Sequence, residues 1–412
     1  MSIFWRAVLF GTITALGAII AQRGFGAFHD GIRPSIREIS RNKGDRTESA
    51  KSVWEMSIGF ILYYGLPFSL VTGVMEKHIF GLMADWIGVR FHRTIFAALS
   101  GALWGVSASL VLAGAQWLFR SLPHPISQDL LQIATPLIAT MPLIPVIAAT
   151  VQFGVRKGLF LVGVPTFLSI LIIKIFTSLS PTPTSFILGV FLHIILATRE
   201  KNPAPFEFPE ALVDGVKEIR KGSVLLMLSG GAFALAGSLL WLGGEPAAVM
   251  LIGVHHPIEA GLIGLYSWIG FAPLVTYTAL ASRAYSPSGM PDGISGLGLL
   301  VRIPVLGPFI GAGAMFGEIW GAKSFIRVFS RYPGLHGAGA AIRDGLLIVT
   351  EISLFVGGVL SANSIWPTFG IYIVVACWLL NEAGGRPVLR VAVGPLAAIG
   401  VGLLMNIYYL TV

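Results

Sequence analysis

Long apolar stretches without a charged residue constrain this chain more than any other feature. Residues 94–119 and 222–244, for example, contain no Asp, Glu, Lys or Arg. A helix of about 20 apolar residues is long enough to cross a bilayer. Only 12% of the residues are charged, whereas about 25% is usual in a soluble domain. A soluble fold is therefore excluded, and we predict an all-α, polytopic membrane protein.

Twelve apolar segments follow one another, six on each side of a charged stretch at residues 199–221. They are residues 7–22, 56–75, 94–119, 130–155, 158–180 and 184–198, and then 222–244, 260–282, 293–321, 345–364, 367–380 and 391–412. We divide the chain into an N-terminal membrane half (1–198), a cytoplasmic amphipathic connector (199–221) and a C-terminal membrane half (222–412). Apolar residues recur at helical spacing in the connector, which favours an interfacial helix between the halves.

The positive charges predict how these segments cross the membrane. Loops 23–51, 199–221 and 323–343 hold seven, five and four Lys or Arg, and twelve strict crossings would place them on both faces, against the positive-inside bias. The conflict disappears if the proline-interrupted segments 130–155 and 293–321 are re-entrant hairpins. Twenty-two of the 28 basic residues then share the inner face, and both termini lie outside.

In this scheme Lys77, Arg90 and Arg93 lie in an outer loop. Each half keeps five spans and one hairpin, which makes about ten transmembrane helices. An odd number of spans in each half would relate the halves as an inverted 5+5 repeat, an architecture found in many secondary transporters.

Signatures of catalysis are missing from the sequence. There is no nucleophile elbow, no zinc-protease motif, no phosphate-binding loop and no Cys-x-x-Cys pair. His256 and Glu259 are three residues apart, but an exposed outer loop explains them better than a metal site does. We therefore expect a protein that is not an enzyme and has no cofactor. An enzyme built on His29, Asp30 and Glu382, or a non-transporting partner subunit, remains the alternative.

Three charged residues lie inside apolar runs, where each costs roughly 2.5–3.5 kcal/mol unless it is paired or hydrated. Arg302 lies two residues before Pro304 in the second predicted hairpin. It is suited to bind a carboxylate or phosphate, or else to pair with Glu318 or Glu351. Glu351 is suited to carry a proton or help to bind Na⁺, with a salt bridge as the alternative. Glu318 lies among closely spaced glycines that favour helix packing.

Two motifs at the edges of apolar runs end in Gly-x-Arg-Pro. One contains Asp30 and Arg33, and the other contains Asn381, Glu382 and Arg386. An acid and an Arg held by such a turn can form a gate or bind an anion, or they can form a local ion pair. Gln152 lies at the end of the first predicted hairpin and would donate to a substrate or satisfy loose carbonyl groups.

These considerations give one set of candidate sites. We assign substrate binding to Gln152, Arg302, Asn381 and Arg386, ion or proton coupling to Glu351 and Glu382, and gate or structural ion pairs to Asp30, Arg33 and Glu318.

The same motifs carry a resemblance that covers most of the chain. They read FHDGIRP at 28–34, QFG at 152–154, GFAPLVTYTALA at 270–281, RYP at 331–333, EISLFVGG from Glu351 and NEAGGRPV at 381–388. With them the chain resembles the YhfT family of uncharacterised bacterial inner-membrane proteins. The resemblance implies a multi-pass protein of the transporter type, and it brings no established site residue with it.

We therefore expect a secondary transporter of a small, polar, anionic metabolite that works by an elevator-like, alternating-access mechanism. Coupling to Na⁺ or H⁺, contact with membrane lipids and a homodimeric scaffold belong to this expectation, and nucleic acid does not. A channel is a third possibility, and it would show flux without saturation or coupling.

Overall fold

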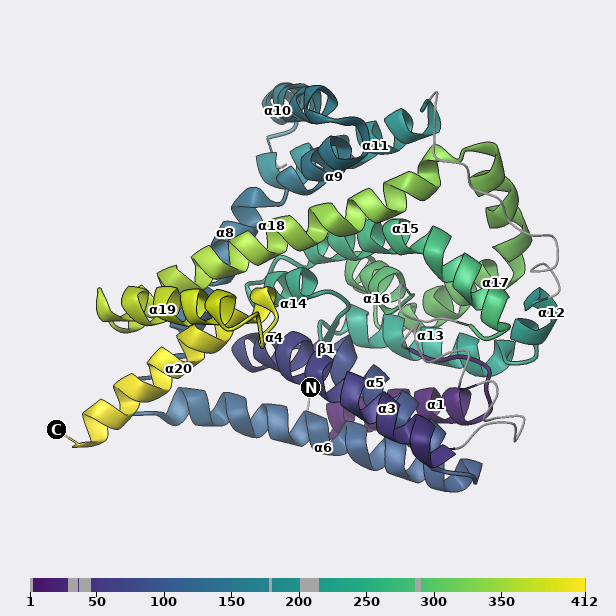
Figure 1. The fold of residues 1–412 in the computed structure, drawn as a ribbon, viewed down its shortest axis with the longest axis horizontal. Helices are drawn as coiled ribbons and strands as arrows, with labels where there is room; N and C mark the ends of the chain where they lie inside the picture. The colour runs from purple at the N-terminus through teal and green to yellow at the C-terminus, as the bar shows by residue number, and fades with distance from the viewer. Residues whose placement is uncertain are drawn as a thin grey trace.

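The computed structural model describes residues 3–28, 36, 46–177, 180–200, 215–285 and 290–411, except for the side chains of Met56, Met290 and Pro291. It is 84% helical (Figure 1). The helices before residue 200 are α1 (Ile3–Gln22), α3 (Arg46–Phe60), the π-helix η2 (Ile61–Gly65), α4 (Leu66–Thr72), α5 (Lys77–Arg90), α6 (Thr94–Ser121), α7 (Ser127–Leu131), α8 (Ala134–Thr140), α9 (Leu143–Phe153), α10 (Val155–Ile175) and α11 (Pro181–Thr198). Those that follow are α12 (Gly215–Arg220), α13 (Ser223–Ser238), α14 (Pro246–Gly253), α15 (Pro257–Ser282), α16 (Met290–Val301), α17 (Gly307–Arg331), α18 (Gly334–Ile365), α19 (Phe369–Ala383) and α20 (Arg390–Thr411).

Seven helices in the described part of the chain are long and apolar enough to cross a membrane, and the bent pair formed by residues 127–153 would be an eighth. The seven are α1, α6, α10, α11, α15, α18 and α20. An all-α, polytopic membrane protein is therefore confirmed. The predicted count of about ten transmembrane helices is not.

Hydrogen bonds between helix termini define two ends of the molecule. Gln22, at the end of α1, bonds to His92 O (2.8 Å) and Thr94 Oγ1 (3.0 Å) at the start of α6. Gln152, at the end of α9, donates to Gly334 O at the start of α18 (2.8 Å). The right-hand side of Figure 1 holds these junctions. We call it the basic end, because the helix termini found there lie next to or include Arg23, Arg93, Arg156, Arg199 and Arg331.

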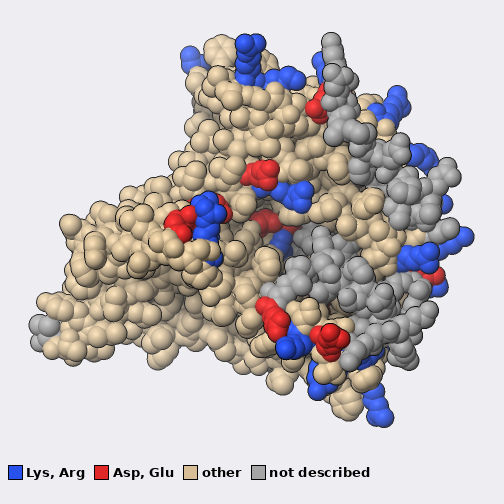
Figure 2. Space-filling model, viewed as in Figure 1, with Lys and Arg blue, Asp and Glu red and all other residues tan. Residues whose placement is uncertain are grey.

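The opposite end contains the last residues of α6, α18 and α20. Asn406 in α20 accepts a hydrogen bond from His124 N, just after α6 (2.8 Å). Figure 2 shows blue side chains along the upper and right-hand margins, whereas the left-hand tip has none in this view. In this view the basic side chains therefore lie away from the opposite end, although Arg93, predicted to lie in an outer loop, precedes α6 at the basic end.

Residues 130–155, predicted to form a re-entrant hairpin, instead run along the whole of α18. Gln132 donates to Ser364 (3.0 Å), Thr140 lies 2.6 Å from Ser353, and Gln152 reaches Gly334. The partners on α18 fall steadily from 364 to 334, so the segment passes from one end of the molecule to the other. Its prolines produce a bend of 53° between residues 127–140 and α9, not a reversal of direction. The first predicted hairpin is therefore wrong.

The segment that does turn back is residues 46–90. Arg46, at the start of α3, donates to Val89 O (3.2 Å) and Phe91 O (3.1 Å) at the end of α5. The chain therefore enters at the basic end through α3, η2 and α4, turns at β1 (Met75–Glu76), and returns through α5. From the sequence we expected residues 56–75 to cross the membrane and residues 77–93 to form an outer loop. The outer loop is wrong, because α5 is a largely buried helix and Lys77 is only 3% exposed. The crossing is not confirmed, since residues 56–75 are divided among α3, η2, α4 and β1.

The second predicted hairpin, residues 293–321, corresponds to α16 and α17. Tyr285, just before this region, donates its N–H to Phe25 O (2.8 Å) at the basic end. Arg331 ends α17, and α18 starts three residues later at the same end. Tyr285 and Arg331 thus lie at the same end of the molecule, whereas α16 begins at the centre, where Asp292 contacts Lys77.

A further turn lies near the C-terminus. α19 leaves the opposite end beside α18 and stops halfway along that helix, where Phe355 packs against Trp378 with ring centroids 4.4 Å apart. α20 then returns toward the opposite end. Its Gly394 lies against the backbone of Leu354 and Gly358 in α18. The loop 384–389 therefore lies near the middle of the molecule, as Figure 1 also shows.

Two hydrophobic cores contain helices from both sides of the connector. The larger core includes Leu137 and Ile144 before it, and Ile263 and Leu354 after it. The smaller core joins α1 and α5 to α13 and α17. Residues 201–214 of the predicted connector lie outside the described residues, and the proposed division of the chain into three regions stays a prediction.

Candidate functional site

Two interrupted helices meet where the cores adjoin. In the N-terminal part of the chain, α4 and α5 are separated by β1. In the C-terminal part, α13 and α14 are separated by β2 (Leu242–Gly243). The two strands pair in parallel, Met75 with Leu242 and Glu76 with Gly243. Gly73 has φ +71° and ends α4 in a left-handed conformation, which glycine adopts without steric cost. The breaks place Lys77 at the start of α5 and Glu245 directly before α14.

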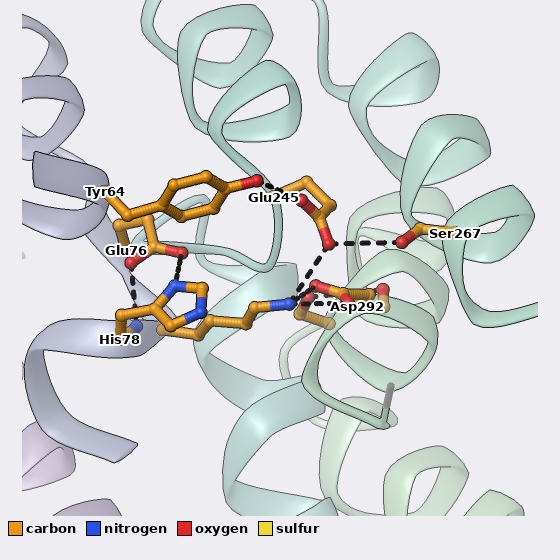
Figure 3. Close-up of polar contacts among 8 residues, drawn as sticks. Tyr64, Glu76, His78, Glu245, Ser267 and Asp292 are labelled. Atoms are coloured by element: carbon orange, nitrogen blue, oxygen red, sulfur yellow. Dashed lines mark hydrogen bonds and ion pairs between the residues drawn. The ribbon is translucent and has the colours of Figure 1, made fainter. Parts of the chain in front are cut away.

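Lys77 is the centre of this region. Its ammonium Nζ lies 2.6 and 2.7 Å from the two carboxylate oxygens of Asp292 and 3.2 Å from Glu245 Oε1. The side chains of Lys77 and Asp292 are 4% and 0% exposed. Figure 3 shows residues from the two parts of the chain converging on this ammonium group. Burial of a charge is tolerated only when it is paired and hydrogen-bonded, and this pair satisfies both conditions.

A second carboxylate, that of Glu76, lies in β1, directly before Lys77. Glu76 is fully buried. It accepts a hydrogen bond from the His78 backbone N–H (2.7 Å), and its Oε1 lies 2.7 Å from His78 Nδ1. The His78 ring stacks on Phe60 and meets Tyr64 edge-on. Glu76 therefore caps α5 and orients the imidazole (Figure 3).

Glu245 precedes α14 and is held more loosely than Asp292. Its Oε1 accepts from Ser267 at 3.2 Å, and its Oε2 accepts from Tyr64 at 3.4 Å. Charge-assisted hydrogen bonds are usually about 2.7–2.9 Å long. The side chain is 13% exposed, so this carboxylate lies at the wall of the site with acceptor capacity remaining.

A cavity of about 330 Å³ adjoins these groups. Its polar wall includes Tyr64, Lys77, His78, Glu245 and Arg343. The remaining lining residues are mostly apolar: Phe28, Phe60, Leu82, Pro246, Ala247, Phe271, Leu346, Leu347, Thr350 and Val391. Figure 2 shows a hollow near the centre of the visible face, with charged side chains in and beside it. A concave, largely apolar space with a few convergent polar groups is typical of small-molecule sites.

The motifs that carry the family resemblance contribute to this wall. Phe28 begins the first motif, Phe271 belongs to the motif at 270–281, Thr350 directly precedes Glu351, and Val391 follows the motif at 381–388. Phe28 and Phe271 thus belong both to the motifs and to the cavity wall, whereas the described charged residues of the motifs do not line the cavity. Asp30 and Arg33, together with His29 of the alternative enzyme site, lie outside the described residues.

Gln152 has all its polar atoms engaged elsewhere. Its Nε2 donates to Glu200 (2.9 Å) and Gly334 O (2.8 Å), and its Oε1 lies 3.0 Å from His193 Nε2. His193 Nδ1 in turn contacts the hydroxyl of Tyr266 (2.9 Å). This geometry favours the structural alternative for Gln152, which joins α9, α11, α15 and α18 at the basic end.

The loop between α19 and α20 is stabilised by its own side chains. Asn381 donates to Val388 O (3.0 Å) and accepts from Val388 N (2.9 Å). Glu382 accepts from Arg386 Nε (2.9 Å) and, through both oxygens, from Arg390 (2.7 Å each). This favours the local ion pair over substrate binding by Asn381 and Arg386, and over coupling by Glu382.

The three charges predicted inside apolar runs are not brought together. Arg302 is exposed, with φ +54°, at the break between α16 and α17. It makes no described ion pair with Glu318 or Glu351, so that alternative is wrong for the described contacts. Glu318 lines a small separate cavity with Tyr285. Glu351 is half-buried on α18. The charged side chains that act on its carboxyl group are those of Arg390, Arg386 and Glu382, in decreasing order of effect.

Sequence reasoning missed the buried cluster because each member lies at the edge of an apolar run. Lys77 follows the run 56–75, Glu245 follows 222–244, and Asp292 precedes 293–321. Charged residues at the edges of apolar runs are normally predicted to lie in loops. The available signal was the interruption by Gly73 in one half and Gly243–Gly244 in the other, since broken segments in both halves mark many transporter sites.

The arrangement is suited to binding a small molecule. Among the described residues, no group of three or more His, Cys, Asp or Glu side chains is placed to hold a metal ion. His256 contacts only Glu259 (3.1 Å) in a described side-chain hydrogen bond. The cavity offers opposite charges on a mostly apolar wall, at a break in two helices.

Comparison with known proteins gives a family. The model of the YhfT family, described as a protein of unknown function, matches residues 6–412. A relative from Escherichia coli (strain K12), named "Uncharacterized protein YhfT", is 25% identical over 99% of this chain and 98% of its own length. No solved structure matches the chain. With the family model covering nearly its whole length, the chain belongs to the YhfT family.

Proposed function

We propose that the protein is a secondary transporter of the bacterial inner membrane that moves a small polar solute with an anionic group. The observation that supports this most is the cavity of about 330 Å³ at the paired helix breaks, with Lys77, Glu245 and Arg343 in its wall. Transporter substrates are commonly bound near the bilayer midplane between discontinuous helices, where half-helix N-termini face the ligand.

The helix breaks are the first support for this proposal. α5 and α14 both begin beside the cavity, at Lys77 and Pro246. Backbone that is not helical is tolerated at membrane depth only where protein or a water-filled cavity covers it. β1 and β2 meet this requirement by pairing with each other. The paired strands therefore provide hydrogen-bond partners for each other's backbone. The space in front of the two helix N-termini stays open.

The position of the cavity between two cores supports alternating access. Met75 and Leu242 belong to the smaller core, whereas Val74 and Ala247, one and five residues away, belong to the larger core. Sliding of one packed unit against the other would move the site without unfolding either. We propose an elevator-like movement of this kind on a scaffold made by two copies of the chain.

The re-entrant segments enter the proposal at new positions. We place one at residues 46–90 and retain the other at residues 285–331, both entering from the basic, cytoplasmic end. The loop 384–389 approaches from the opposite end. β1 and β2 are parallel, whereas an inverted repeat relates equivalent segments that run in opposite directions. The two interrupted helices are therefore not each other's equivalents, and the inverted repeat stays a prediction.

Coupling to H⁺ or Na⁺ is part of the proposal. Three carboxyl groups lie near the ammonium group of Lys77: those of the buried Glu76 and Asp292, and that of the partly exposed Glu245. Carboxyl groups that share one site favour binding of a proton or another cation. Glu351 remains a further candidate, because it follows the cavity residue Thr350 directly.

Uptake into proteoliposomes tests the proposal. Ligands would first be found by thermal-shift screening of metabolites with and without Na⁺; a ligand at 100 times its dissociation constant adds about 2.7 kcal/mol of stability. A transporter gives saturable uptake driven by a Na⁺ or pH gradient, with counterflow in the absence of a gradient. Glu351→Gln should abolish the gradient dependence and leave counterflow intact if Glu351 couples.

Other outcomes contradict the proposal. Ligand conversion without accumulation indicates a membrane-embedded enzyme, and flux that does not saturate indicates a channel. A protein that gains no stability from any ligand and transports none is a partner subunit. Gradient-driven uptake by the Glu351→Gln variant at the wild-type level would remove that residue from the coupling role.

A further inference from the structure

We propose that the solute is a zwitterion: a small amino-acid-like molecule whose ammonium group binds at Glu245 and whose carboxylate binds at Arg343. This inference rests on the proposed function only in taking the cavity as the substrate site. It narrows the expectation of an anionic solute by adding a positive charge. The geometry of two incompletely paired charges on one cavity wall carries it.

Glu245 is a carboxylate prepared for a cation. It lines the cavity, and its contacts with Lys77, Ser267 and Tyr64 are 3.2, 3.2 and 3.4 Å long. The carboxyl group of Asp292 is a further side-chain partner, on the side where both groups share Lys77. Lys77 makes its short contacts with Asp292 instead, at 2.6 and 2.7 Å. An ammonium group approaching from the cavity would supply the short, charge-assisted hydrogen bond that Glu245 does not have.

The ring of Tyr64 lies in the same wall. Aromatic faces attract ammonium groups through their quadrupole. A cation at Glu245 would therefore meet a carboxylate and an aromatic side chain together. Tyr64 and Glu245 come from opposite parts of the chain (Figure 3), so the ligand would bridge α14 and the hairpin 46–90.

Arg343 is the complementary group. It lies in α18 at the cavity wall. Its Nε makes a weak hydrogen bond to Gly339 O (3.4 Å), and its guanidinium carbon lies 5.7 Å from the centre of the Phe271 ring. Within the described chain it forms no ion pair with a carboxylate. The terminal nitrogens are therefore available for the two oxygens of a ligand carboxylate, which a guanidinium binds in a bidentate way.

The remaining residues of the cavity wall determine the chemistry of the uncharged part of the ligand. Phe28, Phe60, Phe271, Leu346 and Val391 surround the charged groups with apolar surface. A ligand with an apolar side chain would bury it here. A simple anion would give Glu245 no ammonium group beyond Lys77, and a simple amine would give Arg343 no carboxylate. Of these ligand classes, only a zwitterion offers an oppositely charged group to both Glu245 and Arg343.

A matched ligand series tests this inference on the purified full-length protein in detergent. Each apolar L-amino acid is compared with the amine that lacks its carboxylate and the acid that lacks its amine. The first sets are leucine with 3-methylbutylamine and 4-methylpentanoate, and phenylalanine with 2-phenylethylamine and 3-phenylpropanoate. Isothermal titration should show at least one amino acid binding about 10-fold or more tightly than both of its analogues.

Two variants assign the charges. With Glu245→Gln, the preferred amino acid should bind no more tightly than its acid analogue. With Arg343→Gln, it should bind no more tightly than its amine analogue. Glu218→Gln and Arg327→Gln change the same residue types on α12 and α17, away from the cavity, and should retain full discrimination. A merely structural role for Glu245 or Arg343 would weaken all three ligands equally, and that result overturns the assignment.

The outcomes separate this inference from the transport proposal. If the acids bind as well as the amino acids do, the solute is a simple anion and the zwitterion is wrong, while transport stands. If no amino acid binds better than its analogues, the inference fails. If an amino acid binds with the predicted discrimination but is not carried into proteoliposomes, the inference stands and transport is wrong.

Discussion

The ammonium Nζ of Lys77 lies 2.6 and 2.7 Å from the two carboxylate oxygens of Asp292, although 215 residues separate them in the sequence. This pair joins the turn of the hairpin 46–90 to the start of α16. Both side chains are almost completely buried. The pair therefore fixes how the two interrupted regions of the chain meet at the cavity.

Removing one partner of this pair should be strongly destabilising. Asp292→Asn or Lys77→Met leaves the other charge buried and unpaired, which costs about 3–5 kcal/mol. The double variant Lys77→Met/Asp292→Leu should lose much less than the sum of the single losses, since neither charge remains. The free energy of unfolding, from SDS titration in micelles, measures these effects. Additive losses would show that the contact does not form.

Gln152 should contribute to stability and not to affinity. Gln152→Ala leaves Glu200, Gly334 O and His193 without their hydrogen bonds. The loss of buried partners costs about 1–3 kcal/mol. Gln132→Ala, which removes an exposed contact to Ser364, should change stability by less than about 0.5 kcal/mol. A dissociation constant raised 10-fold or more by Gln152→Ala would restore its predicted role in substrate binding.

Cysteine labelling tests the two ends of the molecule. In a Cys377→Ala background, single cysteines at Arg93, Lys157 and Arg331 should react with a membrane-impermeant maleimide from one face only. Cysteines at Ser121 and Thr368 should react from the other face. The reason is that α6 and the segment 127–153 both pass from end to end. Labelling of Arg93→Cys and Ser121→Cys from the same face would contradict this topology.

Glu382 should stabilise the loop between α19 and α20 without taking part in coupling. Glu382→Gln weakens the contacts to Arg386 and Arg390, so the thermal midpoint should decrease slightly. The dependence of uptake on the Na⁺ or pH gradient should not change, because the carboxylate is already occupied by two guanidinium groups. Glu218→Gln serves as the control for the substitution. Loss of gradient dependence in Glu382→Gln alone would return the residue to the coupling role.

The sequence predicted the class of the fold because bilayer length and charge exclusion act on every helix independently. From the basic loops it also predicted one reversal in each half, and it placed the first of them at residues 130–155. A charge count fixes only how many such reversals occur, not where. The prolines at 136, 142 and 145 pointed to residues 130–155, but α18 accommodates their bend through Gly345 and Gly357, which lie against the backbone of Ile144 and Ile133.

The site could not be found from the positions of isolated charges. Arg302, Glu318 and Glu351 are costly inside apolar runs and attract notice for that reason. Lys77, Glu245 and Asp292 lie at run edges, where solvent would normally receive them. Their burial depends on tertiary contacts between two distant breaks, and local sequence does not record those contacts. The aromatic and aliphatic wall, in contrast, could be approached through the motifs that begin at Phe28 and Gly270.

Accessibility of the cavity from both faces tests the central claim most directly. Thr350→Cys in the Cys377→Ala background places a thiol in the cavity wall. It would be labelled with an impermeant maleimide in right-side-out and in inside-out vesicles, with Ser121→Cys and Arg331→Cys as one-sided controls. Alternating access predicts labelling of Thr350→Cys from both faces, slowed from both by a saturating ligand, while each control reacts from one face only. Labelling from a single face, at a rate that ligand does not change, would contradict the account.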